Sequence, residues 1–316
     1  MEEYISQTRR KFLKLGAGAL SLAAIPNGVL KASEAPKDFK LTVLHTNDWH
    51  SRIDPFPDDD PKYPGLGGAA RRASLIKAIR KENNNVLLLD AGDVFQGTPY
   101  FNYYGGEPEF KLMSEMGYDA CTLGNHDFDN GIEGLVNMLP HANFPFVNCN
   151  YNFEGTALKG KIKKHVVLKK AGIRIGITGV GIDLKGLVPD QNHEGIHYNN
   201  PIECAEKQAK ELKNTYGCTF VVCLSHLGFE YTEDKVSDRR LAAGTEHIDL
   251  IIGGHTHTFL DSPVIVSNKI GKAVTINQVG WAGLRLGRID YLFSSCNNRT
   301  KEGFTQNKVF RKSIAI

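Results

Sequence analysis

The sequence predicts an α/β protein, because segments with the helical period alternate with short apolar segments typical of buried strands. The helical segments are residues 68–83, 107–117, 131–140, 200–216 and 234–243. The strand-like segments are residues 41–46, 86–90, 119–123, 219–224 and 249–252. The hydrophobic content is 41%, and we find no internal repeat or low-complexity linker. We therefore expect residues 36–316 to form one domain.

Each predicted strand is followed by side chains that can bind metals. They are Asp48, His50, Asp93, Asn125, His226, His255 and His257. Loops at the carboxyl ends of strands converge at one edge of an α/β sheet, so these distant segments can meet at one point. With 11 histidines in the chain, an isolated one is usually a core or surface residue. Four histidines at strand ends, with Gly or Asp neighbours, favour a metal site instead.

The donor set indicates which metals fit. Four imidazoles, two carboxylates and one amide oxygen suit Zn, Mn or Fe better than Ca or Mg, and the sequence does not choose among those three. Two cations held close together repel each other, so we expect the Asp93 carboxylate to bridge a pair of divalent ions. The sequence thus predicts a dinuclear centre without cysteine ligands.

Five ordered motifs carry a resemblance to a known family. They are LHTNDWH from Leu44 to His50, Gly92-Asp93, GNHDFD from Gly124 to Asp129, SHLG from Ser225 to Gly228, and GGHTH from Gly253 to His257. From about Leu41 to Phe293 the chain resembles the metallophosphoesterase superfamily, specifically its 5'-nucleotidase branch. The usual pattern of the branch has Thr where this chain has Trp49, and we expect Trp49 to shape the rim of the site.

The resemblance implies the architecture and the ligand assignment. It implies two facing mixed β-sheets flanked by helices, a four-layer sandwich, with further strands at about 264–267, 273–278 and 285–293. Asp48, His50, Asp93 and His257 would hold one ion, and Asp93, Asn125, His226 and His255 the other. Such a pair makes a coordinated water acidic enough to supply hydroxide for in-line attack at phosphorus.

The leaving group needs a proton, and His126 is the candidate donor because it follows a ligand without being one. Asp129 or Asp127 could accept its ring N–H and favour the imidazolium form. The resemblance favours Asp129, and the structural alternative for Asp127 is a cap for the helix predicted to begin near Gly131.

Residues 1–35 resemble a twin-arginine export signal. Basic residues from Arg9 to Lys14 precede a weakly apolar run from Leu15 to Ile25, which is about half the length of a bilayer span. We therefore expect an exported, periplasmic or extracytoplasmic protein with no stable membrane insertion. Alternatively, these residues are the basic, amphipathic first turns of an ordinary helix.

Charge and cysteine content narrow the function further. Removing residues 1–35 takes away five basic and three acidic residues, so the net charge falls from +3 to +1, which gives no support for nucleic-acid binding. We interpret the basic residues from Arg71 to Lys81 as a solvated helix face. We expect most of the six cysteines to be free, buried thiols. The Asp- and Pro-rich segment from Asp54 to Gly67 follows the first ligand pair and is expected at the site rim.

The resemblance implies a phosphoric ester hydrolase of nucleotide catabolism, acting as a 5'-nucleotidase or on cyclic nucleotides or nucleotide sugars. Longer members of the branch carry a C-terminal nucleotide-specificity domain, which we do not find here, so a separate polypeptide could supply it. Two alternatives stay open: hydrolysis at sulfur by a thiosulfohydrolase on the same scaffold, and a catalytically silent interaction module.

Overall fold

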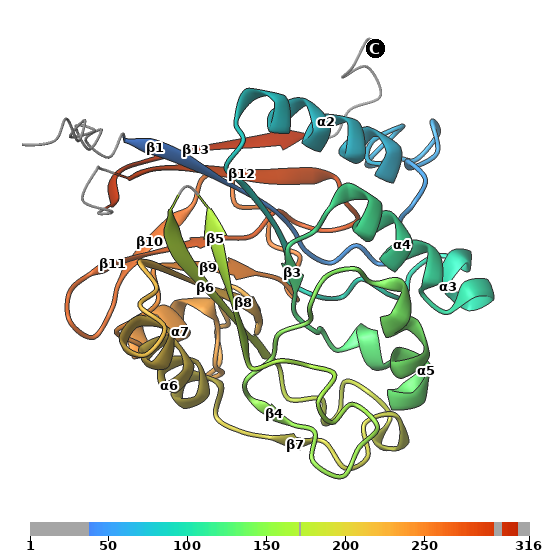
Figure 1. Cartoon of the computed structure of the whole chain (residues 1–316). Helices are drawn as coiled ribbons and strands as arrows, with labels where there is room; N and C mark the ends of the chain where they lie inside the picture. The colour runs from blue at the N-terminus through green and yellow to red at the C-terminus, as the bar shows by residue number, and fades with distance from the viewer. Residues whose placement is uncertain (1–37, 171, 294–298, 309–316) are drawn as a thin grey trace, which may run out of the picture. The chain divides into compact units, whose positions relative to one another are not determined.

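The computed structural model describes residues 38–170, 172–293 and 299–308, the last range for its backbone alone. Two facing β-sheets form its centre (Figure 1). The first has the strand order β13-β12-β1-β2-β3. Its strands are β1 (Phe39–Thr46), β2 (Val86–Asp90), β3 (Ala120–Cys121), β12 (Arg285–Phe293) and β13 (Arg299–Lys308). β1 pairs in parallel with β2 and antiparallel with β12, so the sheet is mixed.

The second sheet has the order β10-β11-β9-β8-β6-β5. Its strands are β5 (His165–Lys170), β6 (Ile173–Gly181), β8 (Phe220–His226), β9 (Leu250–Gly253), β10 (Val264–Ser267) and β11 (Ala273–Asn277). The four strands from β11 to β6 run parallel, so their carboxyl ends point to one edge. β4 (Tyr151–Asn152) and β7 (His197–Tyr198) form a separate two-stranded ribbon near that edge.

Helices cover the outer faces of both sheets. α2 (Ala69–Glu82) and α4 (Glu107–Met116) lie over the first sheet, with α3 (Pro99–Tyr104) and α5 (Gly131–Met138) beyond α4, and α6 (Pro201–Asn214) and α7 (Asp238–Gly244) lie over the second. The described chain also contains three short 3-10 helices: η1 (His126–Phe128), η2 (Leu139–His141) and η3 (Asp190–Asn192). None of the helices in the described ranges is long and apolar enough to cross a membrane.

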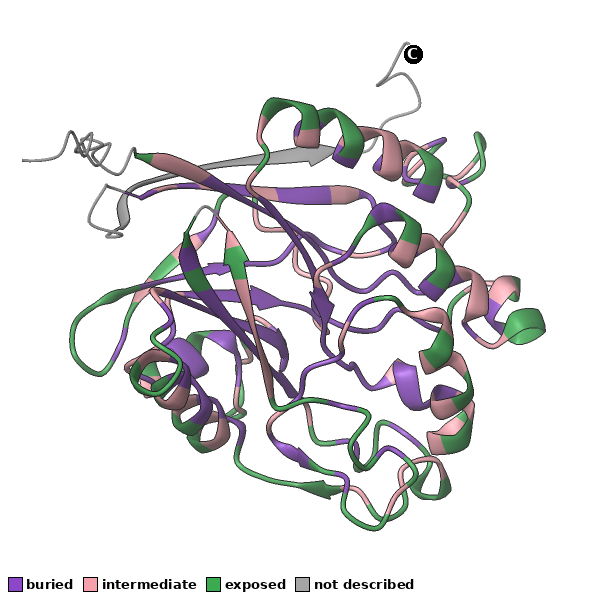
Figure 2. Cartoon of the chain, viewed as in Figure 1, coloured by how far each residue is buried: buried purple, intermediate pink, exposed green. Residues whose placement is uncertain are grey.

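The core occupies three layers. Between the sheets, side chains such as Val43 and Leu89 from the first pack against Ile177 and Val222 from the second. A second cluster joins the outer face of the first sheet to α2 and α4, and a third joins the second sheet to α6 and α7. The central strands β2, β8 and β9 are accordingly buried in Figure 2, whereas β5 and β10 at the edges of the second sheet are partly exposed. This arrangement confirms the predicted four-layer α/β architecture.

Several elements differ from the sequence predictions. The third strand shrinks from 119–123 to Ala120–Cys121, and the helix predicted from 234 begins only at Asp238. β5, β6 and α3 were not predicted, because β6 contains three glycines that dilute its apolar pattern and α3 has six residues. The five cysteines that the structure describes are unpaired, as predicted, whereas residues 1–35 lie outside the described residues.

Two predictions about side chains are wrong. Trp49 is not at the site rim: it is fully buried, and its indole N–H donates to Thr46 Oγ1 at 3.2 Å. Arg72 is not on a solvated helix face, because its guanidinium lies 3.5 Å from the Trp49 ring centroid in the core. Lys77 and Lys81 of the same helix are exposed, as expected.

Candidate metal centre

Backbone hydrogen bonds tie together the loops that leave the carboxyl ends of the strands. The Asp48 N–H donates to Gly92 at 2.9 Å, and the His50 N–H donates to Asp93 at 3.1 Å, which joins the loops after β1 and β2. The His255 N–H donates to the Asp48 carboxylate at 3.0 Å and so joins the loop after β9. Three loops that are distant in sequence are thereby fixed to one another before any ligand binds.

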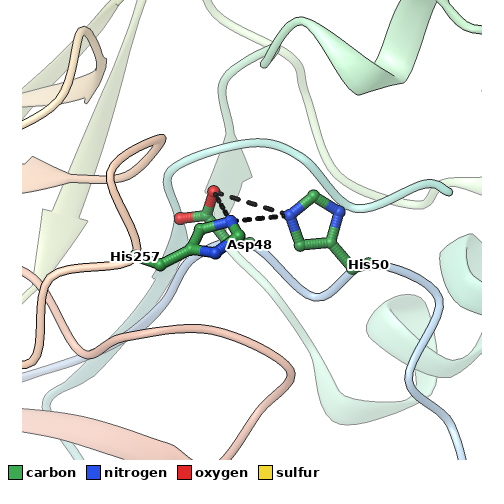
Figure 3. Close-up of side chains that lie close together, drawn as sticks. All are labelled: Asp48, His50 and His257. Carbon is green, nitrogen blue, oxygen red and sulfur yellow. Dashed lines mark hydrogen bonds and ion pairs between the residues drawn. The ribbon is translucent and has the colours of Figure 1, made fainter. Parts of the chain in front are cut away.

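The first group of donors consists of Asp48, His50 and His257 (Figure 3). The two imidazole Nε2 atoms lie 2.9 Å apart. They lie 3.9 Å (His50) and 3.4 Å (His257) from Asp48 Oδ1. Three donor atoms that converge from two loops onto one point form the geometry of a cation site.

The second group consists of Asp93, His226 and His255, with Asn125 beside it. His226 Nε2 lies 3.0 Å from Asp93 Oδ2, and His255 Nδ1 lies 2.8 Å from Asn125 Oδ1. Asp93 Oδ2 is also 4.0 Å from His50 Nε2 of the first group. The structure thus brings all seven sequence-predicted ligands together, with Asp93 between the two groups.

His226 shows that this donor set fits a metal. Its Nδ1 lies 2.7 Å from the Ala91 carbonyl and donates to it, so Nε2 is the nitrogen that faces Asp93. That Nε2 is buried and has no hydrogen-bond partner among the described residues. A distance of 3.0 Å between Nε2 and a carboxylate oxygen requires a positive charge between them, which either a proton on Nε2 or a metal ion bound to both groups would supply.

The pKa shifts of the donor residues also indicate that positive charge is favourable beside Asp93. Burial alone would lower the pKa of His226, but the Asp93 carboxylate outweighs it and raises the value to about 10. Burial would raise the pKa of Asp93, but His226 and His50 lower it. Burial and the charge of His226 lower the pKa of His255 to about 4, which keeps that ring neutral, as a metal ligand must be.

His126 and Asp129 form the predicted hydrogen-bonded pair. His126 Nδ1 lies 2.8 Å from Asp129 Oδ2, and its ring centroid is 5.3 Å from that of His50. The hydrogen bond to Asp129 is the main cause that raises the pKa of His126, against burial. The imidazole remains partly exposed beside the metal groups, so it can reach a bound substrate.

Asp127 is neither the partner of His126 nor a cap for α5. Its buried carboxylate accepts backbone N–H bonds from Gly124 at 2.8 Å, Val94 at 3.0 Å, Asp93 at 3.1 Å and Phe95 at 3.3 Å. It therefore joins the loop after β2 to the loop after β3. Sequence analysis missed this structural role, because nothing in the local sequence shows which distant N–H groups lack partners.

Trp281 is a second residue that sequence analysis missed. Its indole stacks on the His257 imidazole, with ring centroids 5.4 Å apart and planes within 5°. Phe56 and Tyr63 contact Trp281 edge-on at 5.9 and 6.3 Å. The segment from Asp54 to Gly67 thus reaches the metal groups through Trp281. The only sequence signal was its position shortly after β11, in the GWAG segment.

The backbone at the site adopts an uncommon conformation. Five of the seven predicted ligands have positive φ: Asp48 (51°), His50 (48°), Asp93 (55°), His255 (74°) and His257 (51°). Non-glycine residues seldom adopt this left-handed conformation, and such residues gather at functional sites.

Comparison with known proteins agrees with this geometry. Residues 41–259 match the family of calcineurin-like phosphoesterases, and the chain belongs to that family. The 5'-nucleotidase from the venom of Gloydius brevicauda is 34% identical over 289 residues, which cover 85% of this chain and 48% of the venom protein. The rat (Rattus norvegicus) 5'-nucleotidase is 33% identical, with 83% of this chain and 48% of the rat protein covered.

A solved structure shows the same fold. The 5'-nucleotidase precursor from Thermus thermophilus superposes with a TM-score of 0.76 at 33% identity, covering 86% of this chain and 55% of that one. The chain spans about half the length of the curated relatives it matches. The predicted resemblance to the metallophosphoesterases is confirmed at the level of the family.

Proposed function

We propose that this chain is a 5'-nucleotidase that uses two divalent metal ions to hydrolyse phosphate monoesters of nucleosides. The observation that carries the proposal is the position of Asp93 between two groups of imidazoles. A bridging carboxylate offsets the repulsion between two cations, and two cations polarise both the attacking water and the phosphoryl oxygens. The similarity to 5'-nucleotidases supports the choice of nucleotides.

The site residues have distinct roles in this proposal. Asp48, His50, Asp93 and His257 would hold one ion, and Asp93, Asn125, His226 and His255 would hold the other. When bound, the ions supply a nucleophilic hydroxide and neutralise charge on the phosphoryl group. Zn, Mn and Fe all fit this donor set.

His126 donates the proton that the leaving group needs. Asp129 holds its Nδ1–H, so the opposite nitrogen, Nε2, is the one free to face a substrate. The hydrogen bond to Asp129 raises the pKa of His126 and so favours the protonated ring, which can transfer that proton to the departing ester oxygen. Asp129 orients the imidazole and stabilises its positive charge.

The proposal also includes export. The basic residues from Arg9 to Lys14 and the apolar run that follows them support a twin-arginine leader, with residues 36–316 as one catalytic domain. Export of a folded chain would let the metals bind before it leaves the cytoplasm.

Phosphate release tests the proposal. The purified chain is loaded with Mn or Zn and assayed on a panel of 5'-mononucleotides, with bound metal measured in parallel. We expect release that falls roughly 100-fold or more in Asp93→Ala, because that variant lacks the shared ligand. Glu154→Ala, which removes an exposed carboxylate paired with Lys159, is the matched control and should keep full activity.

Two results would contradict the proposal. If the chain binds two metal ions and releases no phosphate from any nucleotide, the substrate assignment is wrong, and thiosulfonate conjugates become the next substrates to assay. If Asp93→Ala keeps its activity and its metal content, the assignment of the centre is wrong.

A further inference from the structure

A cavity of about 360 Å³ lies beside His255, in the size range of small-molecule sites. It is formed by the segments that follow β6 and β8, two parallel neighbours whose last residues, Gly181 and His226, pair with each other. His255 lines this cavity and also belongs to the second group of metal donors. A phosphate ester bound at the metal centre can therefore extend its organic part into the cavity, which we call the Tyr231 pocket.

The wall of the Tyr231 pocket contains two tyrosines and exposed apolar surface. Tyr231 is rigid, because its hydroxyl donates to the Leu227 carbonyl at 2.7 Å and leaves no room for a side chain at Gly228. Tyr198 lies in the β4–β7 ribbon and contacts the Tyr151 ring at 6.3 Å. Tyr198 is still 36% exposed and Leu187 45% exposed. Aromatic walls with accessible faces favour a planar ligand.

The pocket also carries positive charge. Lys185 and Lys235 line it, and neither ammonium makes an ion pair with another residue in the described part of the chain. The Lys235 ammonium lies 5.5 Å from the centroid of the Tyr231 ring. Asp183 is the one carboxylate of the lining, and it accepts the Lys185 backbone N–H at 3.1 Å. The lining therefore attracts an anionic ester more strongly than a neutral compound.

We propose that the Tyr231 pocket binds the leaving group of the phosphate ester and selects for a planar aromatic group, such as the base of a nucleotide. The inference rests on the proposed phosphoesterase function and extends it. It assigns part of the substrate specificity to the described fold itself, through side chains on the segments after β6 and β8. Base stacking on an aromatic side chain contributes about 1–3 kcal/mol, which corresponds to roughly 5- to 150-fold in affinity.

Substitutions of the exposed lining test the inference. Leu187→Ser and Tyr198→Ser change solvent-accessible side chains, so the fold should tolerate them, and Tyr103→Ser at an 81% exposed tyrosine elsewhere is the matched control. The metal-loaded chain is assayed on 5'-AMP and on glycerol 3-phosphate, which has no ring. We expect KM for 5'-AMP to rise about tenfold in the pocket variants, with KM for glycerol 3-phosphate unchanged within about twofold.

A binding measurement separates the two proposals. Adenosine has no phosphate, so its titration into the chain by calorimetry reports on the pocket independently of catalysis. We expect binding to the unmodified chain and to Tyr103→Ser, and weaker binding to Leu187→Ser. Hydrolysis of both esters with unchanged KM in the pocket variants would overturn the pocket while leaving the phosphoesterase function intact. Adenosine binding without hydrolysis of either ester would instead overturn the function.

Discussion

The Asp127 carboxylate offers a direct test of how the loops that carry the proposed metal ligands are held. It is 1% exposed and accepts four backbone N–H bonds, of 2.8 to 3.3 Å, from two loops. Asp127→Ala would leave four buried donors without a partner. Because no other residue replaces the carboxylate oxygens, we expect this variant to lose both folding stability and the preformed position of Asp93.

The magnitude follows from the number of donors. A buried donor left without a partner costs about 1–3 kcal/mol, so four could cost about 4 kcal/mol at the lower limit. Water that enters the space of the lost carboxylate restores part of this, and relaxation of the loop after β2 restores more. We therefore expect a loss of about 3–4 kcal/mol in the free energy of unfolding, a large share of the roughly 5–15 kcal/mol typical of a domain.

Urea denaturation of the metal-free chain, followed by circular dichroism, measures this loss without interference from metal binding. Asp127→Asn should lose less, because its amide oxygen still accepts some of the bonds. Asp190→Ala removes an exposed carboxylate and should change the free energy of unfolding by less than about 0.5 kcal/mol. A loss below about 1 kcal/mol in Asp127→Ala would refute the view that this carboxylate holds the two loops together.

Three further predictions concern the site and its surroundings. Asp129→Asn should lower the pKa of His126, so the alkaline limb of the activity profile should move to lower pH, and an unmoved limb would contradict proton donation by His126. Trp281→Ala should weaken Mn binding about tenfold by freeing the His257 ring, whereas Trp281→Phe should not, as equilibrium titration would show. Burial raises the pKa of Asp238 from the ordinary 3.8 to about 8, so the free energy of unfolding should decrease as the pH rises from about 4 to 8. In Asp238→Asn this decrease should be smaller, as urea denaturation at several pH values would show.

That the seven proposed ligands lie together could be predicted from the sequence, because each belongs to a short motif after an apolar strand. Side-chain direction was less accessible. Asp48 and His50 point to the metal groups, and Trp49 between them points to the helical layer. Neighbouring residues near a strand end face opposite sides, so proximity in sequence to a ligand did not place Trp49 at the rim.

The choice between Asp127 and Asp129 has a similar explanation. His126 to Phe128 form a single 3-10 turn, in which side chains three residues apart eclipse each other. Asp129 therefore lies over His126, whereas Asp127 points to the interior. Trp281 could not be predicted as a contact of His257, because the pairing depends on how the loop after β11 packs against the loop after β9.

The left-handed backbone at Asp48, His50, Asp93, His255 and His257 sets a limit on how this fold can be improved. Each such residue stores on the order of 1 kcal/mol of strain that glycine would relieve. A selection for heat resistance alone would therefore favour glycine at the positions of the proposed metal ligands. At each of these positions a change to glycine would raise stability and remove a proposed metal ligand. Stabilising substitutions that keep activity should therefore lie in the layers distant from the carboxyl ends of the strands.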